Sequence, residues 1–221
     1  MLHGIHEAKI FRHETTSSAL TWTLYALARD SQLQTRLRKE VVEAIDSFSA
    51  EWDLRNVEFS NTLDGLPLLH GVCNEVQRLW PSVPNTSRIA YRDTVISGQT
   101  VPKGTKVFIP IWNINRLEQF WGADAQEFRA ERWINTDNGK PNNHGGCQNN
   151  FGFMTYLHGP RSCIGQGLAR AELKALVAAW LYCFEIEFAD PNFDAEPAGI
   201  VTVKPKGGLK LRMKVLRSFQ T

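Results

Sequence analysis

The sequence predicts a mainly α-helical domain that also carries small antiparallel β-sheets, an α+β arrangement. The segments with helical periodicity or strong helix formers are 14–29, 31–45, 66–80 and 167–184. Residues 88–110 and 200–215 instead alternate β-branched or apolar residues with polar ones, and glycine and proline punctuate both stretches. Strand-like segments therefore follow helical segments in blocks.

The bulk composition is that of an ordinary globular protein. The chain has 221 residues, of which 43% are hydrophobic and 22% charged, enough for one large domain or two small ones. Twenty-five basic residues face 23 acidic ones, a net charge of +2, and the charges are scattered. Nothing in this balance points to a nucleic-acid partner.

The cysteines and the apolar runs bear on cellular context. The four cysteines lie far apart without a Cys-x-x-Cys pair, and no secretory signal precedes them, which argues against a disulfide framework. They are Cys73, Cys147, Cys163 and Cys183. No apolar run approaches the roughly 18 to 20 residues that a membrane-spanning helix needs. We therefore expect reduced, intracellular thiols and no membrane anchor in this chain.

The predicted helices have recognisable ends. Residues 14–29 contain no proline or glycine, and Asp30-Ser31 follows as a break with a candidate cap. A second helix, 31–45, carries apolar residues three or four positions apart. Residues 53–65 are expected to form a loop, and the helix that follows should stop at Pro81.

The remaining segments are turns, strands and loops. Residues 88–110 are expected to form a small antiparallel meander with turns at Ser97-Gly98 and at 102–104. Residues 112–133 show no clean periodicity, and 136–150 are expected to form a polar surface loop. After the 167–184 helix, residues 200–215 should close the chain as a hairpin.

The stretch YLHGPRSCIG, residues 156–165, places Cys163 immediately before a predicted helix. There the sulfur meets the positive end of the helix dipole and free N–H groups, and both favour a thiolate. Arg161 adds a cation, and Gly159 and Gly165 let the backbone turn sharply. This setting suits a thiolate held toward a metal. The competing interpretation is a buried cysteine that merely caps the helix.

Four motifs in order along the chain resemble those of the cytochrome P450 monooxygenases. Tyr156-x-x-Gly-x-Arg-x-Cys-x-Gly is similar to their haem-binding loop, and Glu14-Thr15-Thr16 is similar to the acid-alcohol motif of their long central helix. Glu75-x-x-Arg78 looks like their Glu-x-x-Arg helix, and 128–133 looks like their aromatic-Arg segment. The resemblance covers residues 13–215, and the residues within these motifs are most similar to those of fungal microsomal members.

The resemblance implies a fold and an activity. Residues 1–221 would be a single incomplete domain, in which 13–221 form the carboxy-terminal part of the cytochrome P450 fold. Cys163 would be the axial thiolate of haem iron, and the haem would insert one oxygen atom from O2 into a small apolar substrate. Electrons would come from an NADPH-dependent flavoprotein reductase. The full-length member would sit at the endoplasmic reticulum membrane, with this part facing the cytosol.

The resemblance also assigns roles to single residues. Thr15 would organise the proton path and Glu14 would be its acidic partner. Arg161 and Arg88 would pair with the haem propionates, as arginine does with carboxylates. The other cofactor-binding positions in the loop are Tyr156, Gly159 and Gly165.

Glu75, Arg78 and Arg132 would form a buried triad that braces the cysteine loop. In such a network, loss of one partner costs about 3 to 5 kcal/mol. The residues also have simpler interpretations. A Glu75–Arg78 pair three positions apart is commonly solvated and worth only ~0.2 to 0.5 kcal/mol. Arg132 could stack on Trp133, and Thr15 could bond back to a helix carbonyl.

Some residues depart from the family pattern. Phe11-Arg12 stands where the family has two small residues, so residues 1–12 are predicted to be a non-native leader. Ala130 replaces a usual proline, Asn115 stands where histidine is common, and Tyr156 replaces phenylalanine. Because the amino-terminal half of the fold is missing, we expect exposed apolar surface, aggregation or dependence on a partner segment, and little oxygenation by this chain alone.

Three other functions compete with this interpretation. A zinc module could use His144, Cys147, His158 and Cys163, although their spacing is irregular. Residues 165–170, GQGLAR, could be a dinucleotide loop, but the third glycine is an arginine and no strand–loop–helix unit supports it. The chain could also be a non-catalytic interaction protein built on the remains of the enzyme fold.

Overall fold

The computed structural model describes the backbone of residues 2–47 and 57–217 and the side chains of residues 13–47 and 58–217. Its helices are α1 (Leu2–Arg29), α2 (Ser31–Asp46), α3 (Val57–Gly65), α4 (Pro67–Leu79), α5 (Ile111–Ile114), α6 (Glu118–Trp121), η1 (Ala130–Trp133), η2 (Gly159–Arg161) and α7 (Gln166–Cys183). Its strands are β1 (Thr86–Ile89), β2 (Thr94–Ile96), β3 (Gln99–Val101), β4 (Lys106–Ile109), β5 (Phe184–Phe188), β6 (Pro197–Ala198), β7 (Lys204–Pro205) and β8 (Leu211–Val215). Long helices with small sheets confirm the predicted α+β class.

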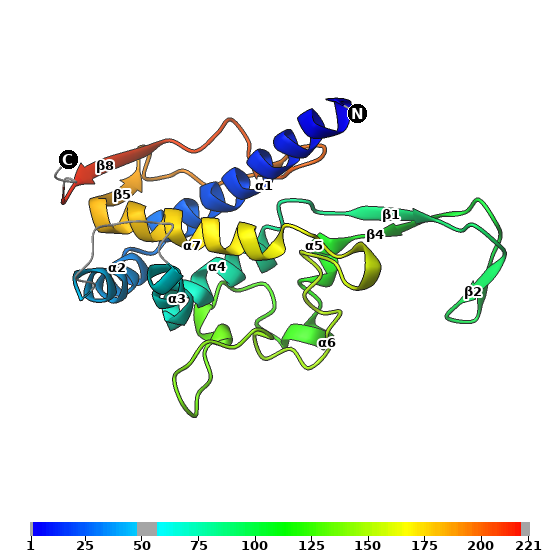
Figure 1. The fold of residues 1–221 in the computed structure, drawn as a ribbon, viewed down its shortest axis with the longest axis horizontal. Helices are drawn as coiled ribbons and strands as arrows, with labels where there is room; N and C mark the ends of the chain where they lie inside the picture. Colours follow the sequence, from blue (N-terminus) through cyan, green and yellow to red (C-terminus); the bar gives the residue numbers. More distant parts are fainter. Residues whose placement is uncertain (1, 48–56, 218–221) are drawn as a thin grey trace.

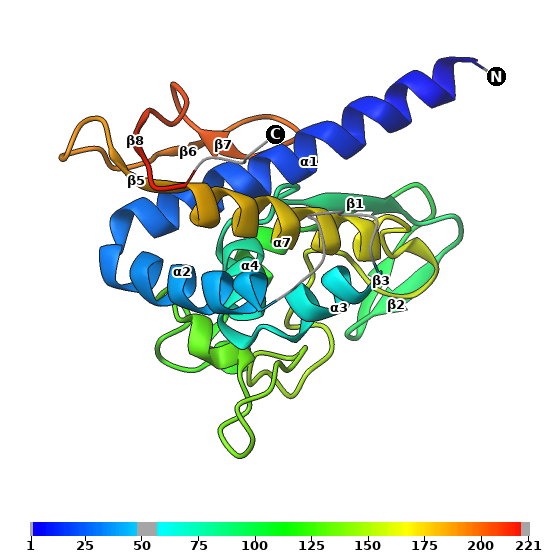
Figure 2. The same ribbon diagram turned by 60° about the vertical axis from the view of Figure 1, so that its left-hand side comes forward.

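The main core lies where α7 packs against α1, α2 and α4 (Figures 1 and 2). Leu37, Leu69 and Leu173, one from each of three of these helices, are almost fully buried there. The helical periodicity in the sequence arises from this packing, because each helix turns one apolar stripe inward. Part of α1, drawn in blue, extends beyond the core in Figure 2.

The structure confirms the helices predicted in segments 14–29, 31–45, 66–80 and 167–184. Asp30 caps α2 as expected, because its Oδ1 accepts a hydrogen bond from the Leu33 N–H at 2.8 Å. The backbone of residues 2–12 continues α1. The Phe11 and Arg12 side chains lie outside the described residues, so the non-native leader stays a prediction.

The loop expected at 53–65 is wrong for residues 57–65, which form α3. Phe59 and Leu63 lie four positions apart and are both buried in the main core. Asp64 at the end of this helix accepts a hydrogen bond from Lys174 of α7 at 2.8 Å. The helix is short, and tertiary packing holds it in place. Residues 53–56 lie outside the described part of the chain.

The expected meander is instead a nested β-ribbon formed by residues 86–109, called the ribbon below. β1 pairs with β4, and β2 pairs with β3 at the far end, so the strands do not follow one another in order. The predicted turn at Ser97-Gly98 is confirmed, because both residues have positive φ, which suits a two-residue hairpin turn. In Figure 1 the ribbon projects from the body of the molecule.

The closing hairpin expected at 200–215 is also wrong. β8 pairs with β5, directly after α7, while β7 pairs with β6. Glu185 and Glu187 of β5 lie opposite Lys214 and Arg212, with ion-pair distances of 3.2 and 3.7 Å. Opposite charges across strands favour this partner and this register.

Residues 111–150 contain only short helices and irregular backbone, as the absence of periodicity indicated. The polar loop 136–150 is confirmed as a loop, although Asn142 and Cys147 within it are buried. Cys147 packs with Trp121 and Trp133 in a small aromatic cluster.

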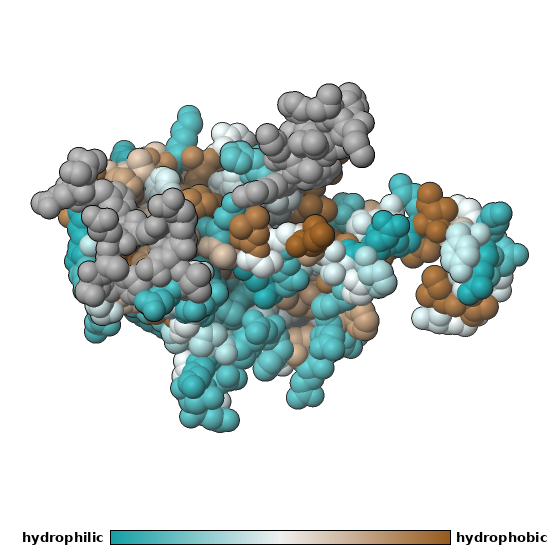
Figure 3. All heavy atoms as spheres, in the orientation of Figure 1, coloured by the Kyte–Doolittle hydropathy of each residue, from teal (hydrophilic) through white to brown (hydrophobic). Residues whose placement is uncertain are grey.

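Two properties of the surface bear on the sequence predictions. Across the described ranges, none of the helices has the length and apolar character that crossing a bilayer requires. Several large apolar side chains are exposed on the ribbon, and Figure 3 shows apolar residues on its projecting part. They are Ile89, Val95, Ile96 and Phe108. Such surface fits the expectation that this chain exposes apolar side chains.

Candidate functional site

Cys163 lies in the loop between η2 and α7, just before the first turn of α7. Its N–H donates to the Tyr156 carbonyl at 2.8 Å, which closes the loop, and its carbonyl accepts from the Gln166 N–H at 3.3 Å. Cys163 is exposed, whereas Cys73, Cys147 and Cys183 are buried. The interpretation of Cys163 as a buried capping cysteine is therefore wrong.

The loop depends on glycine at one position in particular. Gly159 has φ +68°, in the left-handed region that other residues rarely adopt. Gly165 is the N-cap of α7, and a Cβ built there would lie 3.9 Å from the Cys163 sulfur, within van der Waals contact. The glycines in this motif thus give the backbone its turn and leave space beside the sulfur.

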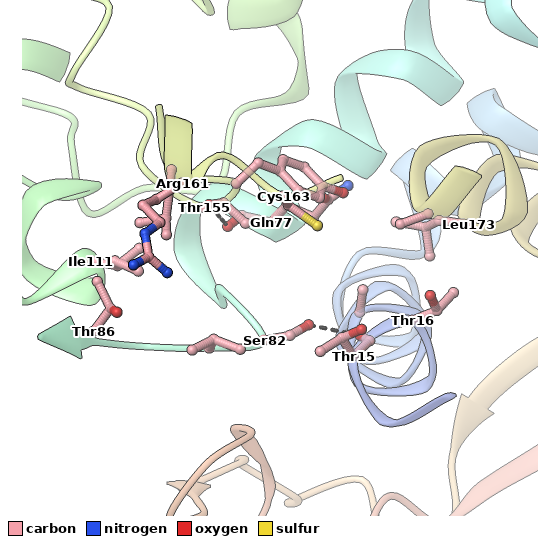
Figure 4. Close-up of a pocket in the computed structure, with 15 residues that line it drawn as sticks. Thr15, Thr16, Gln77, Ser82, Thr86, Ile111, Thr155, Arg161, Cys163 and Leu173 are labelled. Atoms are coloured by element: carbon pink, nitrogen blue, oxygen red, sulfur yellow. Dashed lines mark hydrogen bonds between the residues drawn. The ribbon is translucent and has the colours of Figure 1, made fainter. Parts of the chain in front are cut away.

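The Cys163 sulfur faces a cavity of about 220 Å³ between the cysteine loop and α1 (Figure 4). Side chains from α1, the end of α4, the segment after it, β1, α5, the cysteine loop and α7 surround this space. The lining residues include Thr15, Ala19, Gln77, Thr155, Tyr156, Arg161 and Leu173. The structure thus brings Thr15, Tyr156, Arg161 and Cys163 together, although 141 residues or more separate Thr15 from the others.

The predicted arginines differ in their placement. Arg161 lines the cavity, and Figure 4 shows it on the same side of the space as Ile111 and Thr86, which also line it. Arg88 lies on β1, where its Nη1 donates to Thr86 Oγ1 at 3.1 Å and to the Ser87 carbonyl at 2.9 Å. Thr86 lines the cavity but Arg88 does not. Only Arg161 directly faces the space in front of the sulfur.

Tyr156 connects the cavity wall to α7. Burial raises the pKa of its hydroxyl to about 12, while the nearby Arg170 guanidinium acts in the opposite direction. The Arg170 Cζ lies 5.2 Å from the centre of the Tyr156 ring, within the range of a cation–π contact. The hydroxyl therefore stays protonated near neutral pH.

The Glu14-Thr15-Thr16 motif is divided between two environments. Thr15 and Thr16 line the cavity, and the Thr15 carbonyl accepts from Ser82 Oγ at 2.8 Å (Figure 4). Glu14 does not line it and pairs instead with Lys204 of β7 at 3.5 Å. Both of these charged side chains are nearly half exposed.

Glu75, Arg78 and Arg132 meet in a buried cluster on the α4 side of the core. The Glu75 carboxylate accepts from Arg78 at 2.7 and 2.9 Å and from Arg132 at 3.2 Å. Trp133 Nε1 and the Arg129 N–H donate to the same carboxylate at 2.9 and 3.0 Å. Glu75 and Arg78 are fully buried, so the solvated surface pair is wrong.

The Arg78 guanidinium also fixes the segment that follows the ribbon. Its Nη1 donates to the carbonyls of Asn115 and Ala125, at 2.9 and 2.6 Å, and its Nη2 donates to the carbonyl of Glu127 at 3.0 Å. Sequence reasoning noted Asn115 only as a departure from the histidine common in the family, and it missed Thr155 and Gln77 as parts of this region. No local pattern marks them, because their contacts form only in the folded chain.

The competing sites do not form. Within the described residues, no three His, Cys, Asp or Glu side chains lie close enough together to hold a metal ion, so the four-residue zinc site is wrong. The residues before 165–170 form a 3₁₀ turn and irregular backbone, with no strand leading into the loop. A dinucleotide loop needs that strand, so this interpretation is wrong as well.

Known proteins resemble this chain over most of its length. The family model "Cytochrome P450" matches residues 13–211. The chain is 44% identical over 204 residues to cytochrome P450 monooxygenase ptmK of Penicillium ochrochloron, covering 92% of this chain and 39% of that protein. It is 43% identical over 197 residues to cytochrome P450 monooxygenase sphH of Aspergillus fumigatus, covering 89% and 35%.

A third relative, cytochrome P450 monooxygenase buaD of Petromyces alliaceus, is 36% identical over 212 residues, covering 94% of this chain and 39% of that protein. This chain therefore spans roughly two-fifths of the length of the relatives it matches. The family match covers almost all of the chain, including the cysteine loop, the Thr15 segment and the Glu75 cluster. The chain belongs to the cytochrome P450 family.

Proposed function

We propose that this chain carries the haem-binding part of a monooxygenase, with the Cys163 thiolate as the axial ligand. The observation that carries the proposal is the exposed Cys163 sulfur, which faces a cavity shared with Thr15 and Arg161. Haem is the cofactor of the cytochrome P450 family, and the three relatives above are named monooxygenases. The proposal concerns the whole protein's activity, of which this chain would supply one part.

The residues at the site fit this cofactor. A thiolate is the ligand through which such enzymes hold haem iron. Arg161 supplies a cation at the cavity edge, suited to a propionate carboxylate. Gly159 and Gly167 leave open space beside the loop, because a Cβ at either position would meet nothing within 4 Å. Arg88, on the strand that Thr86 begins, is the second arginine proposed to pair with a propionate.

When bound, haem would supply the oxygen chemistry, in which one atom of O2 would enter a small apolar substrate. The other atom would leave as water, with the electrons supplied by an NADPH-dependent flavoprotein reductase and the protons by solvent. Thr15 would hold a proton at its hydroxyl on the cavity face of α1. Glu14, one residue before it, would exchange protons with solvent, where its carboxylate now pairs with Lys204. The apolar side chains Ala19 and Leu173 would keep water from the sulfur side of the cavity.

The experiment tests the ligand directly. The chain is expressed with haem supplied, reduced, exposed to carbon monoxide and examined by visible spectroscopy. The wild-type chain should show the red-shifted Soret band of thiolate-ligated haem, and Cys163→Ser should lose it. Cys147→Ser is the matched control, because Cys147 is buried, donates to the Asn149 carbonyl at 3.2 Å and is not among the residues that line the cavity. It should keep the band.

Two results would overturn the proposal. A wild-type chain that binds no stoichiometric haem would favour the non-catalytic relic, and a Cys163→Ser band identical to wild type would remove Cys163 as the ligand. Turnover of an apolar substrate with an NADPH-dependent flavoprotein reductase is a separate measurement. The chain aligns with 39% of cytochrome P450 monooxygenase ptmK, and little turnover from this chain alone is part of the proposal.

A further inference from the structure

Asn115 is a buried polar residue at the end of α5, with no part of its side chain exposed. Its Nδ2 donates to the Arg78 carbonyl at 3.1 Å and to Thr155 Oγ1 at 2.8 Å. Its Oδ1 accepts from the Met154 N–H at 2.9 Å. Its backbone carbonyl accepts from Arg78 Nη1 at 2.9 Å. One residue thus contacts both the Glu75–Arg78 pair and the segment leading to the cysteine loop.

The pattern of partners calls for an amide at this position. The Arg78 carbonyl needs a donor, the Met154 N–H needs an acceptor, and Thr155 uses its own hydroxyl proton on the Gln77 carbonyl at 2.8 Å. The side chain at 115 must therefore offer two donors and one acceptor together, which asparagine does. Aspartate offers no donor, and a neutral imidazole offers only one.

These contacts form a continuous connection from the ion-pair cluster to the sulfur. Arg78 bonds to Asn115, and Asn115 bonds to Met154 and Thr155. The next residue along the chain, Tyr156, accepts the Cys163 N–H at 2.8 Å. Thr155 and Tyr156 both line the cavity that the sulfur faces. Removing the Asn115 side chain would break its bonds to Met154 and Thr155, the two residues that precede the Tyr156 carbonyl that holds Cys163.

We propose that Asn115 is the positioning residue that ties the Glu75–Arg78 pair to the cysteine loop and so sets where the Cys163 sulfur lies. The consequence for iron ligation rests on the proposed function, but the effect on the loop does not. Two measurements therefore separate the two claims. Amide hydrogen exchange reports the loop without haem, and the carbon monoxide spectrum reports ligation.

The test compares Asn115→Ala with Asn142→Ala. Asn142 is also buried and also makes three side-chain hydrogen bonds, to the Arg132 carbonyl and from the N–H groups of His144 and Gly145. None of these three bonds is to residues 154–163. Exchange of the amides in peptide 154–163 should be about tenfold faster in Asn115→Ala than in Asn142→Ala. The thiolate Soret band should also be lost in Asn115→Ala and kept in Asn142→Ala.

Thr155→Val keeps the shape of the side chain and removes only the hydroxyl between Asn115 and Gln77, so it covers the case in which Asn115→Ala does not fold. It should also speed exchange in peptide 154–163. Equal exchange in this peptide among wild type, Thr155→Val and Asn115→Ala would overturn the proposal. If the peptide loosens but the wild-type chain shows no thiolate band, the positioning role stands and the haem proposal fails.

Discussion

Replacing Glu75 with glutamine should cost more stability than any surface charge change in this chain. The carboxylate is fully buried and accepts hydrogen bonds from Arg78, Arg132, Trp133 and the Arg129 N–H. The amide keeps one acceptor oxygen, but its NH2 group faces donors and the two arginines lose their counter-charge. Breaking a buried pair in this way costs about 3 to 5 kcal/mol, a large share of the roughly 5 to 15 kcal/mol that stabilises a domain.

Urea unfolding followed by tryptophan fluorescence measures this effect, because Trp133 lies in the same cluster. Arg36→Gln is the control. Arg36 and Glu131 form an ion pair at 2.7 Å, but both side chains are about half exposed, and such pairs are worth about 0 to 1 kcal/mol. A loss in Glu75→Gln no larger than that in Arg36→Gln would refute the claim that the carboxylate is the centre of a buried network.

Gly71→Ala should destabilise the chain by about 1 to 3 kcal/mol, although alanine normally favours helices, because the new Cβ would lie 2.4 Å from the Ala130 carbonyl oxygen. At Gly167 a Cβ would meet nothing within 4 Å, so Gly167→Ala should stabilise the chain by up to about 1 kcal/mol. Thermal unfolding measures both changes, and midpoint temperatures that shift in the same direction in the two variants would contradict this reasoning. Burial lowers the pKa of His70 to about 4 in the folded chain, against about 6.5 when unfolded. Between these pH values only the unfolded chain binds the proton, so stability should fall by up to about 1.4 kcal/mol per pH unit as the pH drops. His70→Gln should flatten that slope in urea titrations across this pH range. A slope equal to that of the wild-type chain would remove His70 as the cause.

Much of the helical fold follows from local patterns, and the strand pairing does not. The α2 stripe and the Asp30 cap lie within a few residues of each other, so their spacing alone predicts the helix and its start. The pairing of β8 depends on the folded chain, because β8 pairs with the distant β5 and not with the preceding strand β7. The alternating apolar and acidic residues of β5, with Lys214 and Arg212 opposite, were the available signal. The helical pattern just before β5 obscured that signal.

The candidate site divides in the same way. The cysteine loop is a short contiguous motif, so all of its residues can be recognised together in the sequence. Asn115 instead acts through partners 37 to 40 positions away, and its neighbours in the sequence give no sign of them. Its role depends on the folded positions of α4 and residues 154–155. The carbon monoxide experiment above tests the proposed role of Cys163, and the roles of Thr15 and the arginines stay predictions.

The nested ribbon has a practical consequence. It lies between Arg78 and Asn115, so the chain leaves the buried cluster along β1 and returns to it along β4. The two strands at its tip pair only with each other in the described part of the chain. Extra sequence spliced between Ser97 and Gly98 would therefore be carried outward, away from the sulfur. A fluorescent reporter inserted at this turn offers a way to follow the protein without altering the candidate site.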